Sequence, residues 1–195
     1  VTIEVTGSNG HYVGGCIGMT TGDIQTVSIS SYGNGLTLSS NGRYLGGIVG
    51  KCDGTIVDVT IESVLNITSS FAGRYTIVEG GSSSVGNTFV YDAYVGGVAG
   101  YANIFGSALP GYAKNNGNNF NYNAYSPELS NYREDVRMIS NLTIKTVQGA
   151  VGGIVGYVKN FGSIVYMESV IQIDSSGQSV GGVIGFVEQN MWHEY

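Results

Sequence analysis

Two glutamates, Glu62 and Glu168, begin near-identical hexapeptides in distant parts of the chain, ESVLNI at 62–67 and ESVIQI at 168–173. Glycosidases use two carboxylates about 5–10 Å apart, one as acid and the other as base or nucleophile. Carboxylates along one edge of a β-helix would suit polysaccharide cleavage. Rungs of a β-helix lie about 4.8 Å apart, however, and intervening rungs would separate these two carboxylates too far. We therefore interpret both as outward-facing polar residues and predict no enzymatic activity.

Metal ligands are sparse along the chain. His193-Glu194 matches the first half of a His-Glu-x-x-His zinc motif, with only Tyr195 after it, whereas zinc needs three or four ligands. Asp23 and Asp53 lie at or next to the turns after two glycine-rich segments and could bind Ca²⁺ in stacked turns. Calcium takes six to eight oxygen ligands, and each turn offers one acid. We predict no metal and no cofactor.

The best candidate for binding is a long segment at about 102–137 that contains both prolines and the Asn-rich run 115–123. Aromatic faces stack on sugar rings, asparagine amides bond to hydroxyls, and tyrosine suits protein interfaces. The segment therefore predicts binding of a carbohydrate or a host-surface protein, or a role in assembly. The alternative is that its aromatic side chains pack back against the body of the protein. The candidate residues are Tyr112, Phe120, Tyr122, Tyr125 and Tyr132.

Two cysteines and two glycosylation sequons complete the reactive side chains. Cys16 aligns with aliphatic residues of the repeat described below, so we interpret it as a core residue, while Cys52 falls at the turn after its repeat. The two are not aligned with each other, and either a disulfide or two free thiols fits the pattern. Asn66-Ile-Thr and Asn141-Leu-Thr match the N-glycosylation sequon, which matters in a secreting eukaryote.

The element that must position all of these residues is a glycine-rich hexamer that occurs five times. The copies are VGGCIG at 13–18, LGGIVG at 45–50, VGGVAG at 95–100, VGGIVG at 151–156 and VGGVIG at 180–185. The first glycines of successive copies are 32, 50, 56 and 29 residues apart. The repeat glycines are Gly14, Gly15, Gly46, Gly47, Gly96, Gly97, Gly152, Gly153, Gly181 and Gly182.

The short spacings match a rung of about 30 residues with three short strands, which predicts an all-β chain folded as a β-solenoid of about five rungs. We expect one domain over 1–195, with insertions at about 69–93 (hairpin-like) and 102–137 (the Asn/Tyr-rich loop). Like residues should stack in ladders, one led by Val13 and another by Ile17. Apolar residues on both sides of the glycine strand are typical of a strand covered on both faces. No helical period appears in the sequence.

Composition agrees with a packed structural protein. Of 195 residues 32 are glycine, without a collagen period, and only 11% are charged against 42% hydrophobic. These values exclude collagen and disorder. The net charge of −6 argues against nucleic-acid binding, and no apolar run is long enough for a membrane span. The chain opens on Val1 without an initiator Met, which indicates a processed or excised segment.

The five hexamers resemble the GLUG-motif repeats of bacterial and microbial surface proteins, including adhesins and segments of IgA-cleaving metallopeptidases. The Gly-x-Ile strands at Gly22, Gly54 and Gly162 share this resemblance, which covers most of the chain outside the two insertions. It implies a secreted or cell-surface location. The zinc motif of the peptidases is absent from this sequence, so their activity is not implied.

Three functions fit this pattern. The first is a non-catalytic extracellular or cell-surface module with a structural or adhesive role, such as an adhesin stalk. The second is a subunit of an extracellular filament built by end-to-end stacking, and the third is a carbohydrate-active β-helix enzyme. Solenoid ends expose unpaired strand edges, and this sequence shows no amphipathic helix that would cap them. We therefore expect self-association, or neighbouring coils, at both ends.

Overall fold

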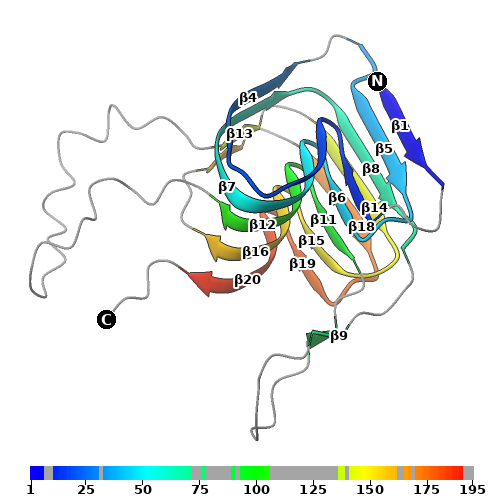
Figure 1. Ribbon diagram of the computed structural model, residues 1–195. Coiled ribbons are helices and arrows are strands. Elements are labelled where there is room, and N and C mark those ends of the chain that lie inside the picture. Colours follow the sequence, from blue (N-terminus) through cyan, green and yellow to red (C-terminus); the bar gives the residue numbers. More distant parts are fainter. Residues whose placement is uncertain are drawn as a thin grey trace, which may run out of the picture.

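The computed structural model describes residues 1–6, 11–30, 33–71, 76–77, 89–90, 93–105, 136–138, 141–161, 165–167 and 170–190. These residues form an all-β structure without a helix, built mainly from three parallel sheets (Figure 1). We name them sheets A, B and C in the order in which the chain enters them.

Each sheet is assembled from strands that are far apart in the sequence. Sheet A contains β1 (Thr2–Val5), β5 (Leu36–Ser40), β8 (Leu65–Ser69), β14 (Leu142–Thr146) and β18 (Ile171–Ser175). Sheet B contains β2 (Tyr12–Gly14), β6 (Tyr44–Gly46), β11 (Tyr94–Gly96), β15 (Ala150–Gly152) and β19 (Ser179–Gly181). Sheet C contains β3 (Ile17–Thr20), β4 (Ile24–Ser30), β7 (Val49–Glu62), β12 (Ala99–Phe105), β13 (Val136–Met138), β16 (Val155–Phe161), β17 (Val165–Met167) and β20 (Ile184–Asn190).

The chain visits the three sheets in the same order five times, and we call each passage a rung. Rung 1 runs from β1 to β4, rung 2 from β5 to β7, rung 3 from β8 to β13, rung 4 from β14 to β17 and rung 5 from β18 to β20. Every strand of sheets A and B pairs in parallel with the equivalent strand of the adjacent rung. Equivalent residues therefore lie beside each other along the stack.

The predicted ladders are confirmed by this register. Val13 pairs with Leu45, and the row continues through Val95, Val151 and Val180. Ile17 pairs with Val49, and its row continues through Ala99, Val155 and Ile184. In the inner rungs the residues of both rows are fully buried.

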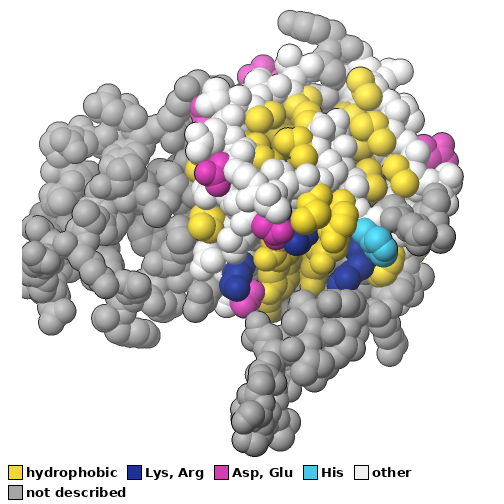
Figure 2. Space-filling model, viewed as in Figure 1, with side chains coloured by type: hydrophobic (Ala, Val, Ile, Leu, Met, Phe, Trp, Pro, Cys, Tyr) yellow, Lys and Arg dark blue, Asp and Glu magenta, His cyan; other side chains and the backbone are white. Residues whose placement is uncertain are grey.

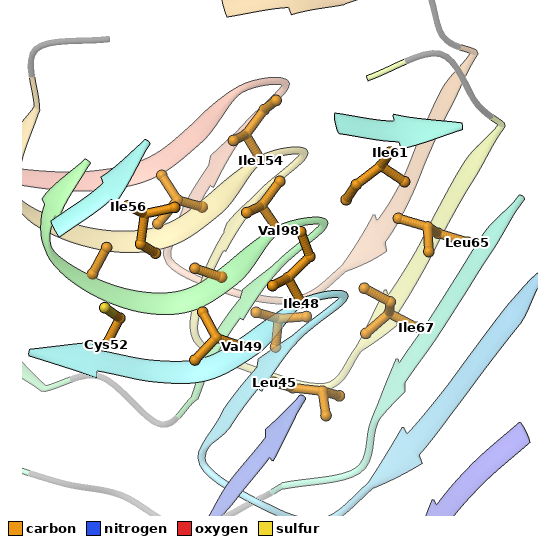
Figure 3. Close-up of a cluster of buried hydrophobic side chains, with 14 of the residues drawn as sticks. Leu45, Ile48, Val49, Cys52, Ile56, Ile61, Leu65, Ile67, Val98 and Ile154 are labelled. Atoms are coloured by element: carbon orange, nitrogen blue, oxygen red, sulfur yellow. The ribbon is translucent and has the colours of Figure 1, made fainter. Parts of the chain in front are cut away.

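The interior is apolar because inward positions alternate along each strand. In β5, β8 and β14 the first, third and fifth residues are buried and the intervening ones are more exposed, as expected for strands with one face on a core. Side chains from all three sheets meet there (Figure 3). The cluster includes Leu45, Ile48, Cys52, Ile61 and Leu65, none of them accessible to solvent.

The interpretation of the glycine segment as one strand covered on both faces is wrong. Each hexamer contains the end of a sheet B strand, a bend at its third and fourth residues, and the start of a sheet C strand. The two apolar ladders therefore belong to different sheets that line the same interior. The hexamer is a corner, which explains why apolar residues seem to occupy both of its sides.

The cysteines are both free. Cys16 is exposed although its equivalents Ile48, Val98 and Ile154 are fully buried, because within the described residues no rung covers the outer side of rung 1. The interpretation of Cys16 as a core residue is thus wrong. Cys52 does not lie at a turn: it sits inside β7, fully buried.

Two long excursions leave the rungs. The first leaves rung 3 between β8 and β11 and carries the short strands β9 (Thr76–Ile77) and β10 (Phe89–Val90), which pair antiparallel. The second leaves the same rung within sheet C, between β12 and β13. Both excursions therefore begin and end on strands whose register is fixed by neighbouring rungs.

Candidate functional site

The feature that repeats most strictly is the glycine corner between sheets B and C, and each of its three glycines has a different steric reason. In rung 2, a Cβ on Gly46 would collide with the carbonyl oxygen of Val49 in the same hexamer. A Cβ on Gly47 would collide with the carbonyl oxygen of Gly97 in the next rung. A Cβ on Gly50 would lie 2.6 Å from the backbone nitrogen of Val13 in the preceding rung. Backbone therefore packs against backbone at this corner, and only glycine permits it.

An aromatic ladder runs along the outside of this corner. Its residues directly precede the hexamer in rungs 1 to 3 and directly follow it in rungs 3 to 5. Neighbouring rings contact each other at centroid distances of 5.1 Å (Tyr12–Tyr44), 5.2 Å (Tyr44–Tyr94), 5.0 Å (Tyr94–Tyr157) and 5.2 Å (Tyr157–Phe186). The first and last of these pairs are stacked, and the two middle pairs are tilted. We call this set the aromatic ladder: Tyr12, Tyr44, Tyr94, Tyr101, Tyr157 and Phe186.

The ladder is tightly packed, and the pKa values of two of its hydroxyl groups are raised. Tyr94 and Tyr157 are buried, and the hydroxyl of Tyr157 donates a hydrogen bond of 2.6 Å to Glu188 Oε2. Burial, followed by this hydrogen bond, raises the pKa of Tyr157 far above that of free tyrosine. Burial and the nearby charge of Asp53 raise the pKa of Tyr101 to about 12. The phenols of Tyr101 and Tyr157 are therefore neutral at physiological pH.

The ladder has a structural rather than a ligand-binding geometry. Ring faces are the surfaces that stack on sugars, and here each ring packs against a ring of a neighbouring rung, stacked in some pairs and tilted in others. Tyr12, on rung 1, is the exception, with 41% of its surface exposed. Two cations complete the ladder, since Arg43 lies 5.3 Å from the ring centre of Tyr44 and Lys51 lies 5.6 Å from that of Tyr101. The contact between Lys51 and Tyr101 joins rung 2 to rung 3, whereas Arg43 and Tyr44 belong to the same rung.

The two aspartates considered for calcium make contacts within the protein. Asp23 Oδ1 accepts a 2.8 Å hydrogen bond from the backbone nitrogen of Thr55, which ties rung 1 to rung 2. Asp53 Oδ2 pairs with Lys51 Nζ at 2.7 Å, and its carbonyl accepts a hydrogen bond from Asn103 Nδ2 at 3.0 Å. In the described part of the chain no three His, Cys, Asp or Glu side chains come together as a metal site.

The remaining sequence candidates are scattered. Glu62 is exposed at the end of β7, and Glu168 lies outside the described residues, as does His193-Glu194. Asn66 is half-buried in β8, and Asn141 is exposed just before β14. The binding candidates of the Asn/Tyr-rich segment also lie outside the described residues, namely Tyr112, Phe120, Tyr122, Tyr125 and Tyr132.

A hollow on the described surface lies at the C-terminal ends of three strands of sheet A. It has a volume of about 250 Å³ and is lined by Thr68, Lys145, Asp174 and adjacent residues of β8, β14 and β18. Thr68 and Asp174 flank Lys145 in the register of sheet A. The hollow is open and exposes mostly apolar atoms, and its lining includes one cation and one carboxylate.

The aromatic ladder was missed in the sequence. Its signal was present as an aromatic residue directly before or directly after each hexamer, as in Tyr44 and Tyr101. The residues before and after the hexamer belong to different sheets, and only the tight corner brings them into contact.

Comparison of the chain with family models, with curated proteins and with solved structures finds no match in any of the three. The resemblance to GLUG repeats therefore stays a prediction that depends on the five hexamers. Within the described residues, no helix has the length and apolar character needed to cross a membrane.

Proposed function

We propose that this chain is a β-solenoid that acts outside the cell as a non-catalytic structural and adhesive module. The observation that carries the proposal is the repetition of one corner geometry in successive rungs, with like residues in register in all three sheets. Such stacking makes a stiff body in which each rung contacts only its neighbours. A stiff body of this kind suits the presentation of a binding segment at a distance from its anchor.

The adhesive part of the proposal assigns recognition to the Asn/Tyr-rich segment between β12 and β13. Long segments inserted into a regular scaffold usually carry function. This one is rich in tyrosines and asparagines, and Lys114 is the only charged residue between Ser107 and Pro127. Its ligand class is a neutral glycan or a glycosylated surface protein, because stacking and amide hydrogen bonds need no charge on the ligand.

The test compares three chains on a glycan array and on cultured cells. The first is the parent, the second has residues 106–135 replaced by a short Gly/Ser linker, and the third keeps the segment but has five aromatic residues replaced by serine. Those five are Tyr112, Phe120, Tyr122, Tyr125 and Tyr132. We expect all three to keep the β-sheet circular dichroism and only the parent to bind.

Two outcomes would contradict the proposal. Equal binding by all three chains would remove the segment from recognition. Loss of the β-sheet signal in the linker chain would show that the segment belongs to the core and is not an appended binding element.

A further inference from the structure

Gly182, in rung 5, has no reason within the described chain to be glycine at its position. At the equivalent position in other rungs, a Cβ would collide with a carbonyl oxygen of the following rung, as Gly15 would with Gly47 and Gly153 with Gly182. A Cβ on Gly182 itself meets no atom within 4 Å. Glycine in a strand costs backbone entropy. Its presence at position 182 is explained if another backbone packs there, and the described residues do not supply one.

Gly18, in rung 1, likewise lacks the contact that its equivalents make, but on the opposite side of the stack. The sixth hexamer glycine normally packs against the preceding rung, with Cβ distances of 2.6 Å from Gly100 to the nitrogen of Leu45 and 2.5 Å from Gly185 to the nitrogen of Val151. Gly18 meets only the carbonyl of Tyr12 in its own rung, at 3.0 Å. The two outermost rungs are thus shaped for neighbours on opposite sides.

The backbone groups of the two edges are also complementary. At each corner the N–H groups donate towards the following rung, from Cys16 to the carbonyl of Ile48 at 3.0 Å and from Ile154 to the carbonyl of Val183 at 2.8 Å. By the same geometry, the Val183 N–H points out of rung 5 and the Cys16 carbonyl points out of rung 1. At this corner rung 5 therefore presents donors and rung 1 presents acceptors, whereas just before the hexamer the direction is reversed, as in the hydrogen bond from Ala150 N to the carbonyl of Ala93.

The side chains of the two edges match as rows. Val180 and Val183 in rung 5 are 49% and 39% exposed, and their rows begin in rung 1 at Val13 and Cys16. Phe186 belongs to the row that begins at Met19, which is 43% exposed. Hydrophobic side chains are also open to solvent between β4 and β1 at the rung 1 end (Figure 2).

We propose that two copies of this chain associate head to tail, with rung 5 of one copy stacked on rung 1 of the next. In that arrangement sheets A, B and C continue across the junction as parallel sheets. Gly182 then meets the carbonyl of the next copy's Gly15, and Gly18 meets the backbone of the preceding copy's Val180, so both glycine mismatches are resolved by one contact. The inference rests on the solenoid architecture proposed above and names its partner.

One row of side chains in sheet A would bring like charges together at this junction. Glu4 and Asp174 occupy the two ends of the same outward row of sheet A, so the junction places two carboxylates side by side. Salt screens such exposed charges. Association should therefore strengthen as ionic strength rises, in contrast to an interface held by opposite charges.

Disulfide trapping tests the register directly. Stacked rungs lie about 4.8 Å apart, and a disulfide needs Cα atoms about 4.4–6.8 Å apart. In the proposed stack, Val183→Cys places a thiol beside Cys16 of the next copy, while Cys52 stays buried and unreactive. Mild oxidation should give a ladder of covalent oligomers on a non-reducing gel, with the peptide that contains Cys16 joined to the peptide that contains position 183.

Two further chains make the test decisive. Adding Cys16→Ser to Val183→Cys should abolish the ladder and leave at most dimers. Adding Gly182→Ala to Val183→Cys should reduce cross-linking at least tenfold without lowering the melting temperature, because the added methyl group obstructs only the junction.

The possible failures are distinguishable. Dimers joined only through position 183, or a ladder unaffected by Gly182→Ala, would overturn head-to-tail stacking. If the parent unfolds cooperatively with β-sheet circular dichroism but the Val183→Cys variant yields no cross-link, the stacking is overturned while the proposed function stays intact. A parent without a cooperative β-sheet transition would overturn the solenoid and both proposals together.

Discussion

The glycine corner makes a sharp prediction about stability, because chemically identical substitutions at two equivalent positions should have opposite effects. Gly153→Ala places a methyl group against the carbonyl oxygen of Gly182 and 3.0 Å from Ile171 Cδ1. Gly182→Ala places the same group where no described atom lies within 4 Å. Both positions are third in their hexamers, so propensity and local sequence are matched.

The loss of stability in Gly153→Ala can be estimated from the displacement that the added methyl group requires. Rungs 4 and 5 would have to separate by up to about 1 Å at the corner, and overpacking of this kind costs about 1–3 kcal/mol. The separation also strains the hydrogen bond of 2.8 Å from Ile154 N to Val183 O, and such bonds each contribute about 0.5–1.5 kcal/mol. We expect Gly153→Ala to lower the free energy of unfolding by about 2–3 kcal/mol. At about 2–4 °C per kcal/mol for a chain of this size, the melting temperature falls by about 4–12 °C.

Gly182→Ala should instead raise the free energy of unfolding by about 0.4–1 kcal/mol, because it reduces the entropy of the unfolded chain. Urea unfolding followed by circular dichroism measures both variants, at protein concentrations low enough to avoid association. Equal urea midpoints for Gly153→Ala and Gly182→Ala would refute the explanation, since inter-rung contact would then not be the reason for glycine at this position.

Three other predictions concern single side chains. Tyr157→Phe keeps the ring stack but removes the hydrogen bond to Glu188, and should cost about 1 kcal/mol in urea unfolding; no loss would show that the carboxylate is equally well solvated without it. Because folding raises the pKa of Tyr101, the unfolded chain loses the phenol proton at lower pH than the folded chain does. The contribution of this group to stability is complete below about pH 10 and is lost as pH rises towards about 12. Tyr101→Phe should therefore make the melting temperature fall less steeply over that range, and an unchanged slope would contradict the raised pKa of Tyr101. Thr26 has a φ of 53°, a backbone conformation that is strained for a β-branched residue. Thr26→Gly should therefore stabilise the protein by about 1 kcal/mol, whereas the control Gln25→Gly should destabilise it. A loss of stability in both variants would show that glycine does not relieve strain at Thr26.

The spacing and residue types of the hexamers predicted the register of the rungs. Val13 and Leu45 share a position relative to their glycines, and stacking places them opposite each other. The all-β content with parallel pairing follows from the same repetition. Here local pattern and long-range pairing agree because each rung repeats the environment of the one before it.

The corner itself could not be derived from the pattern. Alternation specifies which residues share a face of one strand, and it cannot show where a strand bends into another sheet. The burial of both Leu45 and Val49 depends on a bend at Gly47 and Ile48, which the glycines permit but do not prescribe.

The aromatic ladder and the exposure of Cys16 depend on which rungs are neighbours. Tyr44 and Tyr101 come from different sheets and rungs, and their rings meet edge to face at a centroid distance of 6.2 Å. Cys16 has the sequence environment of Ile48, but among the described residues it has a neighbouring rung on one side only. Ring contacts and exposure therefore depend on how the rungs are stacked, and the sequence of a single repeat does not specify them.

The place where the second excursion leaves rung 3 has a consequence for how this chain can diversify. Phe105 pairs with Ile56 and Val136 pairs with Val59, so the two points that residues 106–135 must join are bridged in rung 2 by two residues. The cost of closing a loop grows only with the logarithm of its length, about 2 kcal/mol for a tenfold extension. Because neighbouring strands fix both points, this position can accept foreign segments of very different length without disturbing the rungs. New binding sequences can therefore be inserted between Phe105 and Val136.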